Sequence, residues 1–209
     1  MYENWITGVY SSGEIETMAT KSVAHGDAQT LTDLKEVGWT KPQHNQSKIN
    51  FDASWSDNFS LAGYGMILRD ETGEVVQAKA GSIRASTAED SEALSLLETA
   101  CWAKSMELSN FWVEGDCERL ILFAQNKVSN IFWRNQAIVS EAVRILQTCN
   151  NFLGFAFKNR KCNEVADALA KEARKKGIHK QVWLHMPVFI SSFLLFDVLF
   201  PIQFRTVIL

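Results

Sequence analysis

Short runs of alternating apolar and polar residues begin at residue 48, and longer apolar stripes of helical spacing follow them. The alternation predicts three strands, at residues 49–55, 63–69 and 74–79, separated by turn residues. Helical spacing predicts four helices, at about residues 86–106, 118–125, 135–149 and 163–176. Two further short apolar runs predict strands at residues 111–113 and 152–157. The order β-β-β-α-β-α-α-β-α predicts an α/β domain whose sheet starts as an antiparallel meander.

Residues 1–47 are polar, with only scattered apolar positions, and are predicted to be a disordered or loosely attached leader. Trp39 has two open interpretations, a side chain docked on the domain or a linker aromatic. The first 13 residues lack the basic start and apolar core of a secretory signal. We therefore expect an intracellular protein, nuclear or cytoplasmic, that is not secreted.

Residues 177–209 form an apolar C-terminal extension that follows the last predicted helix. Its most apolar stretch, residues 188–200, contains Asp197 and has about 13 residues, whereas a membrane helix needs roughly 20. We expect the extension to pack on the domain or on a protein partner, with no membrane span.

The net charge of −3 gives no global basic field, so any nucleic-acid contact must be local. The stretch 158–180 is locally basic, which suits either a phosphate-tracking surface or a solvated helix end. The four cysteines form no C-x-x-C pair and are interpreted as free thiols in a reducing compartment.

Four acids stand at the edges of the predicted elements: Asp52, Glu92, Asp116 and Asp167. Taken singly, each has an ordinary explanation as a turn, capping or solvated helix residue. Brought together, they would repel one another unless cations occupied the cluster. Hard divalent ions such as Mg²⁺ prefer oxygen ligands, so the set points to metal-dependent phosphoryl chemistry.

Five segments in order resemble the ribonuclease H domain, most closely the reverse-transcriptase-associated type of plant retroelements and of plant proteins derived from them. The resemblance covers about residues 48–176 and is carried by KINFDAS (48–54), GYGMILRD (63–70), EALSLLE (92–98), EGD (114–116) and NEVADALA (163–170). It implies a five-stranded mixed sheet with helices on both faces. It also implies that Asp52, Glu92, Asp116 and Asp167 are catalytic and metal-binding residues.

The helix acid has competitors, and the resemblance selects Glu92 because relatives place it 24 residues before the next Asp. Glu89 is explained as the capping-box partner of Ser86. Two departures from relatives are visible. Arg160 stands where many active relatives have His, as is common in the plant-type branch. Ala88-Glu89-Asp90 replaces a Thr-Asn-Asn turn that contacts the hybrid in relatives.

The function implied by the resemblance is hydrolysis of the RNA strand of an RNA–DNA hybrid. Two Mg²⁺ ions about 4 Å apart would bind the scissile phosphate, with Mn²⁺ as a substitute and Asp52 as the bridging ligand. Predicted nucleic-acid contacts are Ser54, Asn58, Arg160 and Asn163, although a turn role is an alternative for Ser54 and Asn58, and an N-cap role for Asn163.

Two other functions stay open. The domain could bind nucleic acid without cleaving it, having kept the fold after separation from a retroelement polyprotein. It could also be a protein-interaction module that uses the apolar extension. The intact set of four acids favours the enzyme over the non-catalytic domain, and the interaction module has the least support.

Overall fold

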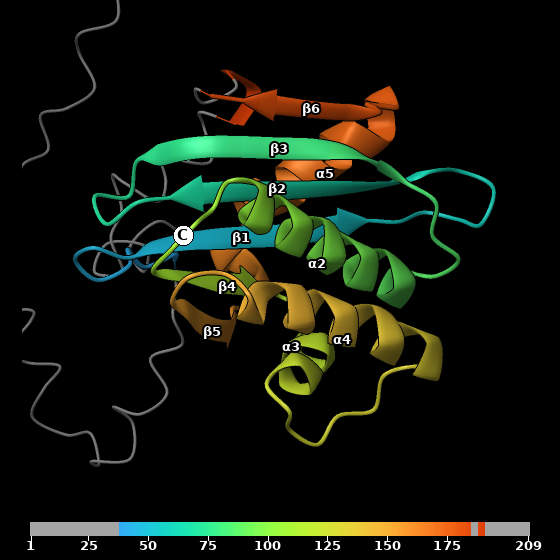
Figure 1. Cartoon of the computed structure of the whole chain (residues 1–209). Coiled ribbons are helices and arrows are strands. Elements are labelled where there is room, and N and C mark those ends of the chain that lie inside the picture. The colour runs from blue at the N-terminus through green and yellow to red at the C-terminus, as the bar shows by residue number, and fades with distance from the viewer. Residues whose placement is uncertain (1–37, 185–187, 191–209) are drawn as a thin grey trace, which may run out of the picture. The chain divides into compact units, whose positions relative to one another are not determined.

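The computed structural model describes residues 38–184 and 188–190. A six-stranded sheet with the order β5-β4-β1-β2-β3-β6 forms its centre (Figure 1). The strands are β1 (Ser47–Ser54), β2 (Ala62–Arg69), β3 (Val75–Ile83), β4 (Phe111–Gly115), β5 (Phe152–Phe157) and β6 (Lys180–Trp183). Strands β1, β2, β3 and β6 pair antiparallel, whereas β4 pairs parallel to both β1 and β5. The sheet is mixed as predicted, with six strands in place of five.

Helices cover both faces of this sheet (Figure 1). On one face lie α2 (Ala88–Ser105), α3 (Glu118–Ala124) and α4 (Trp133–Gln147), and on the other lies α5 (Glu164–Lys176). Two short 3-10 turns, η1 (Arg160–Cys162) and η2 (Val188–Ile190), complete the described elements. In the described part of the chain, no helix has the length and apolar character that a membrane crossing requires.

The two faces of β1 explain how the sheet holds both a core and a polar site. Ile49 and Phe51 are fully buried in the larger apolar cluster, which includes Leu96 of α2. Asn50 and Asp52 point to the opposite face, because successive strand residues alternate. Apolar packing therefore anchors the strand from one side while polar side chains occupy the other.

Helix α5 approaches β2 very closely because two glycines leave room for its backbone. A Cβ atom on Gly63 would lie 2.0 Å from the carbonyl oxygen of Ala170, and one on Gly65 would lie 2.5 Å from the Ala170 amide nitrogen. Neither distance is possible for a real side chain. The glycines thus fix the helix that carries Asp167 against the strands that carry the site.

The folded region starts earlier than the predicted boundary at residue 47. Trp39 is only 8% exposed, and it contacts side chains from β2 and β4. Of its two interpretations, the docked side chain is confirmed and the linker aromatic is wrong. Residues 1–37 lie outside the described part of the chain.

The C-terminal boundary also differs from the prediction, because part of the extension belongs to the domain. Residues 180–183 form β6, which pairs with β3, and Ile190 is fully buried in the second apolar cluster, which Trp183 flanks. Within the described residues, the extension therefore packs on its own domain. Residues 185–187 and 191–209 lie outside this description, so the predicted protein partner stays a prediction.

Candidate metal centre

Three of the four predicted acids converge where β1, β4 and α2 meet. Asp52 lies near the end of β1, Asp116 directly follows β4, and Glu92 is in the second turn of α2. One carboxylate oxygen from each of these three residues lies within 4.8 Å of the others. Parallel pairing of β1 and β4 brings the ends of both strands to one edge of the sheet, which explains the convergence.

Hydrogen bonds to the β1 backbone hold the elements around this cluster. Ser95 of α2 donates its hydroxyl to the carbonyl oxygen of Asp52 at 2.8 Å. From the other side of the strand, Asn163 donates its side-chain amide to the carbonyl oxygen of Phe51, also at 2.8 Å. Asp52 is therefore fixed through its backbone by groups from both α2 and the start of α5.

Burial and mutual repulsion raise the proton affinity of the cluster. Asp52 is 3% exposed, and burial, followed by the charge of Glu92, raises its pKa well above the ordinary value. Burial, with the Asp116 charge as the next cause, raises the pKa of Glu92 to about 8. A backbone N–H hydrogen bond from Ala53 opposes this shift without reversing it. Without a cation, the folded protein thus holds protons at this site.

The donor set suits a hard divalent cation. Glu92 Oε2 is buried and has no hydrogen-bond partner among the described residues. An unpartnered buried carboxylate oxygen is unfavourable, and coordination to a cation would satisfy it. All three side chains offer oxygen, the ligand that Mg²⁺ and Mn²⁺ prefer. The residues present therefore fit a metal centre.

Asp167 occupies a different position from the other three acids. It lies in the first turn of α5, and its carboxylate pairs with Arg160 at 3.3 Å and with Lys171 at 2.6 Å. Its charge nevertheless contributes to the raised pKa values of Asp52 and Glu92, so it lies within electrostatic range of the cluster. The structure brings three of the four predicted acids together, with Asp167 nearby and held by two cations.

The predicted nucleic-acid contacts at the end of β1 have separate positions. Ser54 is 8% exposed, and its hydroxyl accepts a hydrogen bond from Arg174 Nε at 2.9 Å. Asn58 is exposed in the loop between β1 and β2, inside a turn that Asp57 closes by accepting backbone hydrogen bonds. Ser54 therefore links β1 to α5, and Asn58 stays accessible to a ligand.

The two predicted contacts near α5 also differ from each other. Arg160 is 73% exposed on its side chain and lies at the rim of the cluster, close enough that Asp116 and Asp52 raise its pKa together with Asp167. Asn163 is 1% exposed. Its amide nitrogen is bound to the β1 backbone, and its buried Oδ1 has no hydrogen-bond partner among the described residues, so its nucleic-acid contact stays a prediction. Asn163 stands at the N-cap position of α5, as predicted, but its side chain makes no capping hydrogen bond.

The start of α2 corrects the predicted capping pair of Ser86 and Glu89. Thr87 is the N-cap, and its hydroxyl accepts from the backbone N–H of Asp90, whose carboxylate accepts from the N–H of Ser86. Glu89 instead accepts hydrogen bonds from the N–H of Phe132 and the side chain of Asn135. The residues that cap α2 are therefore Thr87 and Asp90, each one position later than the predicted pair, and Glu89 joins α2 to the start of α4.

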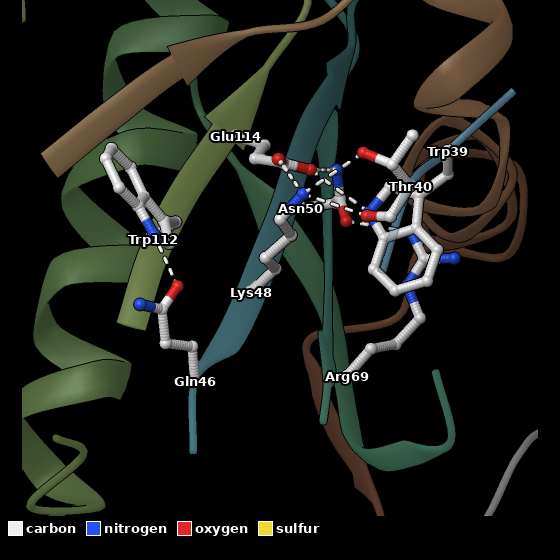
Figure 2. Close-up of polar contacts among 8 residues, drawn as sticks. All are labelled: Trp39, Thr40, Gln46, Lys48, Asn50, Arg69, Trp112 and Glu114. Atoms are coloured by element: carbon white, nitrogen blue, oxygen red, sulfur yellow. Dashed lines mark hydrogen bonds and ion pairs between the residues drawn. The ribbon is translucent and has the colours of Figure 1, made fainter. Parts of the chain in front are cut away.

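Three polar residues next to the site were not predicted as part of it: Trp39, Asn50 and Glu114. Asn50 and Glu114 are fully buried, and each stands two residues before an acid of the cluster (Figure 2). Asn50 and Glu114 are polar residues inside otherwise apolar strands, and this pattern could have indicated that they belong to a buried polar group. Their contacts with Trp39 join distant parts of the chain, so the sequence could not show them.

A mixed sheet of this order, with acids at the adjoining ends of β1 and β4, defines a ribonuclease H-like α/β domain. The family model described as "Reverse transcriptase-like" matches residues 50–173, and the chain belongs to this family. No curated protein matches the chain.

Solved structures of ribonucleases H share the fold. RNase H1 from the halophilic archaeon Halobacterium salinarum NRC-1 is 20% identical, with a TM-score of 0.58 over 63% of this chain and 99% of that chain. An N-terminal RNase H domain from Mycobacterium tuberculosis is 17% identical, with a TM-score of 0.57 over 63% and 95% of the two chains. LC11-RNase H1, solved with an RNA/DNA hybrid, is 20% identical, with a TM-score of 0.54 over 63% and 98%. At these identities the similarity establishes the fold.

Proposed function

We propose that the protein is a Mg²⁺-dependent endonuclease that hydrolyses the RNA strand of RNA–DNA hybrids. The observation that carries this proposal is the convergence of Asp52, Glu92 and Asp116 within 4.8 Å, with Glu92 Oε2 buried and lacking a partner among the described residues. The family match and the hybrid bound in the structure of LC11-RNase H1 support the substrate class. Mn²⁺ can substitute for Mg²⁺, because it accepts the same oxygen ligands.

The residues of the chain divide the work by position. Asp52, Glu92 and Asp116 would each supply a carboxylate oxygen to the metal, since one ligand atom from each lies within 4.8 Å of the others. Bound Mg²⁺ would supply Lewis-acid stabilisation of the scissile phosphate and of the leaving 3′-oxygen. Asp52 and Glu92 must release their protons for binding, so metal affinity rises with pH.

Two exposed side chains, one of them beside the acids, would orient the hybrid. Arg160 presents an exposed guanidinium beside the acids and would contact a backbone phosphate. Asn58 is accessible and would contact the ribose 2′-hydroxyl, the group that distinguishes RNA from DNA. A descent from plant retroelements and an intracellular location stay predictions.

The proposal is tested with purified protein and an end-labelled RNA–DNA hybrid, in Mg²⁺ and in EDTA. Single-stranded RNA and duplex DNA of the same sequence serve as substrate controls. We expect cleavage of the RNA strand of the hybrid alone, and only with Mg²⁺ or Mn²⁺. If the protein binds the hybrid but cleaves it in neither Mg²⁺ nor Mn²⁺, the proposed enzyme activity is wrong and the protein is a non-catalytic nucleic-acid-binding domain.

A further inference from the structure

A buried hydrogen bond joins β1 and β4 one step before the acids. Asn50 and Glu114 are register partners in the parallel pair, and each precedes an acid, Asp52 or Asp116, by two residues. Side chains two residues apart on a strand share a face, so Asn50 lies on the face of Asp52. The amide nitrogen of Asn50 donates to Glu114 Oε2 at 3.0 Å. The bond therefore links the two strands directly beside the proposed metal centre.

The Glu114 carboxylate is fully enclosed and has three donors. Its side chain is 1% exposed, and Oε2 also accepts from the indole Nε1 of Trp39 at 3.0 Å (Figure 2). Oε1 pairs with Lys48 Nζ at 2.9 Å. A buried carboxylate with donors from three directions cannot rotate without breaking a bond, so its position is fixed.

Arg69 fixes the other end of this group. Its Nη2 donates to the amide oxygen of Asn50 at 2.8 Å, and its guanidinium lies 3.4 Å from the centroid of the Trp39 ring. The oxygen of Asn50 thus accepts while its nitrogen donates to Glu114, which leaves the amide one orientation. Trp39 contacts both charged groups that hold Asn50, so it closes the network.

Trp39 comes from a segment that precedes the residues matched by the family model, 50–173. The neighbouring Thr40 carbonyl accepts a hydrogen bond from Lys48 Nζ at 2.8 Å, which fastens this segment to β1. The residues that match the family therefore do not include Trp39 or its segment.

We propose that Trp39, Asn50 and Glu114 are positioning residues for the metal centre. Their hydrogen bonds hold β1 and β4 at one separation, so that Asp52 and Asp116 stay close despite the repulsion of like charges. A pre-organised ligand set binds a cation without first having to rearrange. This inference rests on the proposed function, because it assigns a role toward the same metal site.

The test compares two tryptophans of the full chain. Trp39→Phe removes the indole donor to Glu114 and keeps an aromatic ring over Arg69. Trp112→Phe is the matched control. Trp112 lies on β4, as Glu114 does, but its Nε1 donates to Gln46 at 3.1 Å, outside the Glu114 network (Figure 2). Each change removes one indole hydrogen bond, so loss of a bond alone affects both variants.

Calorimetric titration with Mn²⁺ gives the dissociation constant, and melting without metal gives the stability. We expect Trp39→Phe to weaken Mn²⁺ binding roughly tenfold and Trp112→Phe to change it by less than about twofold, as for partners that orient metal ligands. Both variants melt at lower temperature than the wild type. The weaker Mn²⁺ binding of Trp39→Phe should persist at a temperature at which both variants are fully folded, a result that loss of folded protein would not give.

Glu114→Gln provides a second variant with the same readout, measured at a temperature at which it is fully folded. The double variant that combines Trp39→Phe with Glu114→Gln is expected to bind Mn²⁺ no more weakly than Glu114→Gln alone, because both changes act through the carboxylate of Glu114. Equal Mn²⁺ affinity in Trp39→Phe and Trp112→Phe overturns the inference and leaves the metal site standing. Absence of Mn²⁺ binding by the wild type overturns the proposed function, and the inference with it.

Discussion

Two buried clusters of polar side chains lie next to each other on β1 and β4. Negative charge is neutralised in the first, around Glu114, and is not neutralised in the second, around Glu92. Around Glu114, one carboxylate receives donors from Trp39, Lys48 and Asn50. Around Glu92, three carboxylates meet, and one oxygen of Glu92 has no partner among the described residues. The first group is balanced by cations from the chain, whereas the second has an excess of negative charge.

This contrast separates a structural group from a ligand site. A buried ion pair with complete hydrogen bonding is tolerated because each charge has a partner. A cluster of like charges destabilises the fold until something outside the chain compensates it. The raised pKa values of Asp52 and Glu92 follow from this uncompensated negative charge and from burial. The excess charge therefore marks the binding site, and the balanced group supports it.

The largest expected effect comes from removing a ligand of the proposed metal centre. Asp52→Asn should reduce hybrid cleavage at least a thousandfold, since loss of metal stabilisation worth about 4 kcal/mol corresponds to that factor. Initial rates in Mg²⁺ measure the effect. Glu141→Gln, an exposed acid on α4 that pairs with Arg144, is the control and should keep the wild-type rate. Cleavage by Asp52→Asn at the wild-type rate would show that the mechanism is wrong.

Neutralising one acid in each group should change stability in opposite directions. Glu114→Gln is expected to lower the free energy of unfolding by about 3 kcal/mol, because it removes the buried carboxylate charge that pairs with Lys48. Glu92→Gln is expected to raise it by roughly 1 kcal/mol without metal, because it removes repulsion and gives the cluster a donor. Urea unfolding at pH 8 in EDTA measures both. Changes of the same sign would contradict the contrast between the two groups.

Mg²⁺ should stabilise the folded protein by binding only the folded state. At a concentration of one hundred times the dissociation constant, the expected gain is about 2.7 kcal/mol. Melting with and without Mg²⁺ measures it. Asp52→Asn should lose most of the gain, whereas Glu141→Gln should retain it. An equal gain in Asp52→Asn would place the binding ion elsewhere.

The metal-free protein should lose stability as pH rises from about 4.5 to about 8. The folded-state pKa of Glu92 is raised from 4.5 to about 8, so in this window the folded state holds a proton that the unfolded state has released. Stability is therefore fully present below the unfolded pKa and falls as pH rises, by roughly 1 kcal/mol per unit. Urea unfolding across this range tests it, and Glu92→Gln should reduce the slope, leaving the part that comes from the raised pKa of Asp52.

Local patterns were sufficient for most of the fold, whereas the assignment of the acids came from the resemblance. Strand β5 was predicted with its observed bounds, and the other elements were close, because alternation and helical stripes are local signals. The resemblance selected Glu92 among neighbouring acids, and the structure places Glu92 beside Asp52 and Asp116. Asp52 and Asp116 follow from strand ends that parallel pairing brings to one edge.

Features that depend on distant contacts were missed or misassigned. Strand β6 is short and mostly exposed, and only its pairing with β3 makes it a strand. The sequence could not show that the polar side chain of Asn163 is buried, with its amide nitrogen bound to the backbone of β1. Glu89 had a local partner in the sequence and a distant one in the structure, at the start of α4. None of these contacts has a local signature.

The central claim is that Asp52, Glu92 and Asp116 jointly bind a divalent cation, and anomalous diffraction from crystals grown with Mn²⁺ tests it most directly. We expect an anomalous peak within about 2.5 Å of carboxylate oxygens from all three residues. The peak should disappear in Asp52→Asn crystals grown under the same conditions. A wild-type crystal with no peak at these three acids, in saturating Mn²⁺, would show that they do not form a metal site.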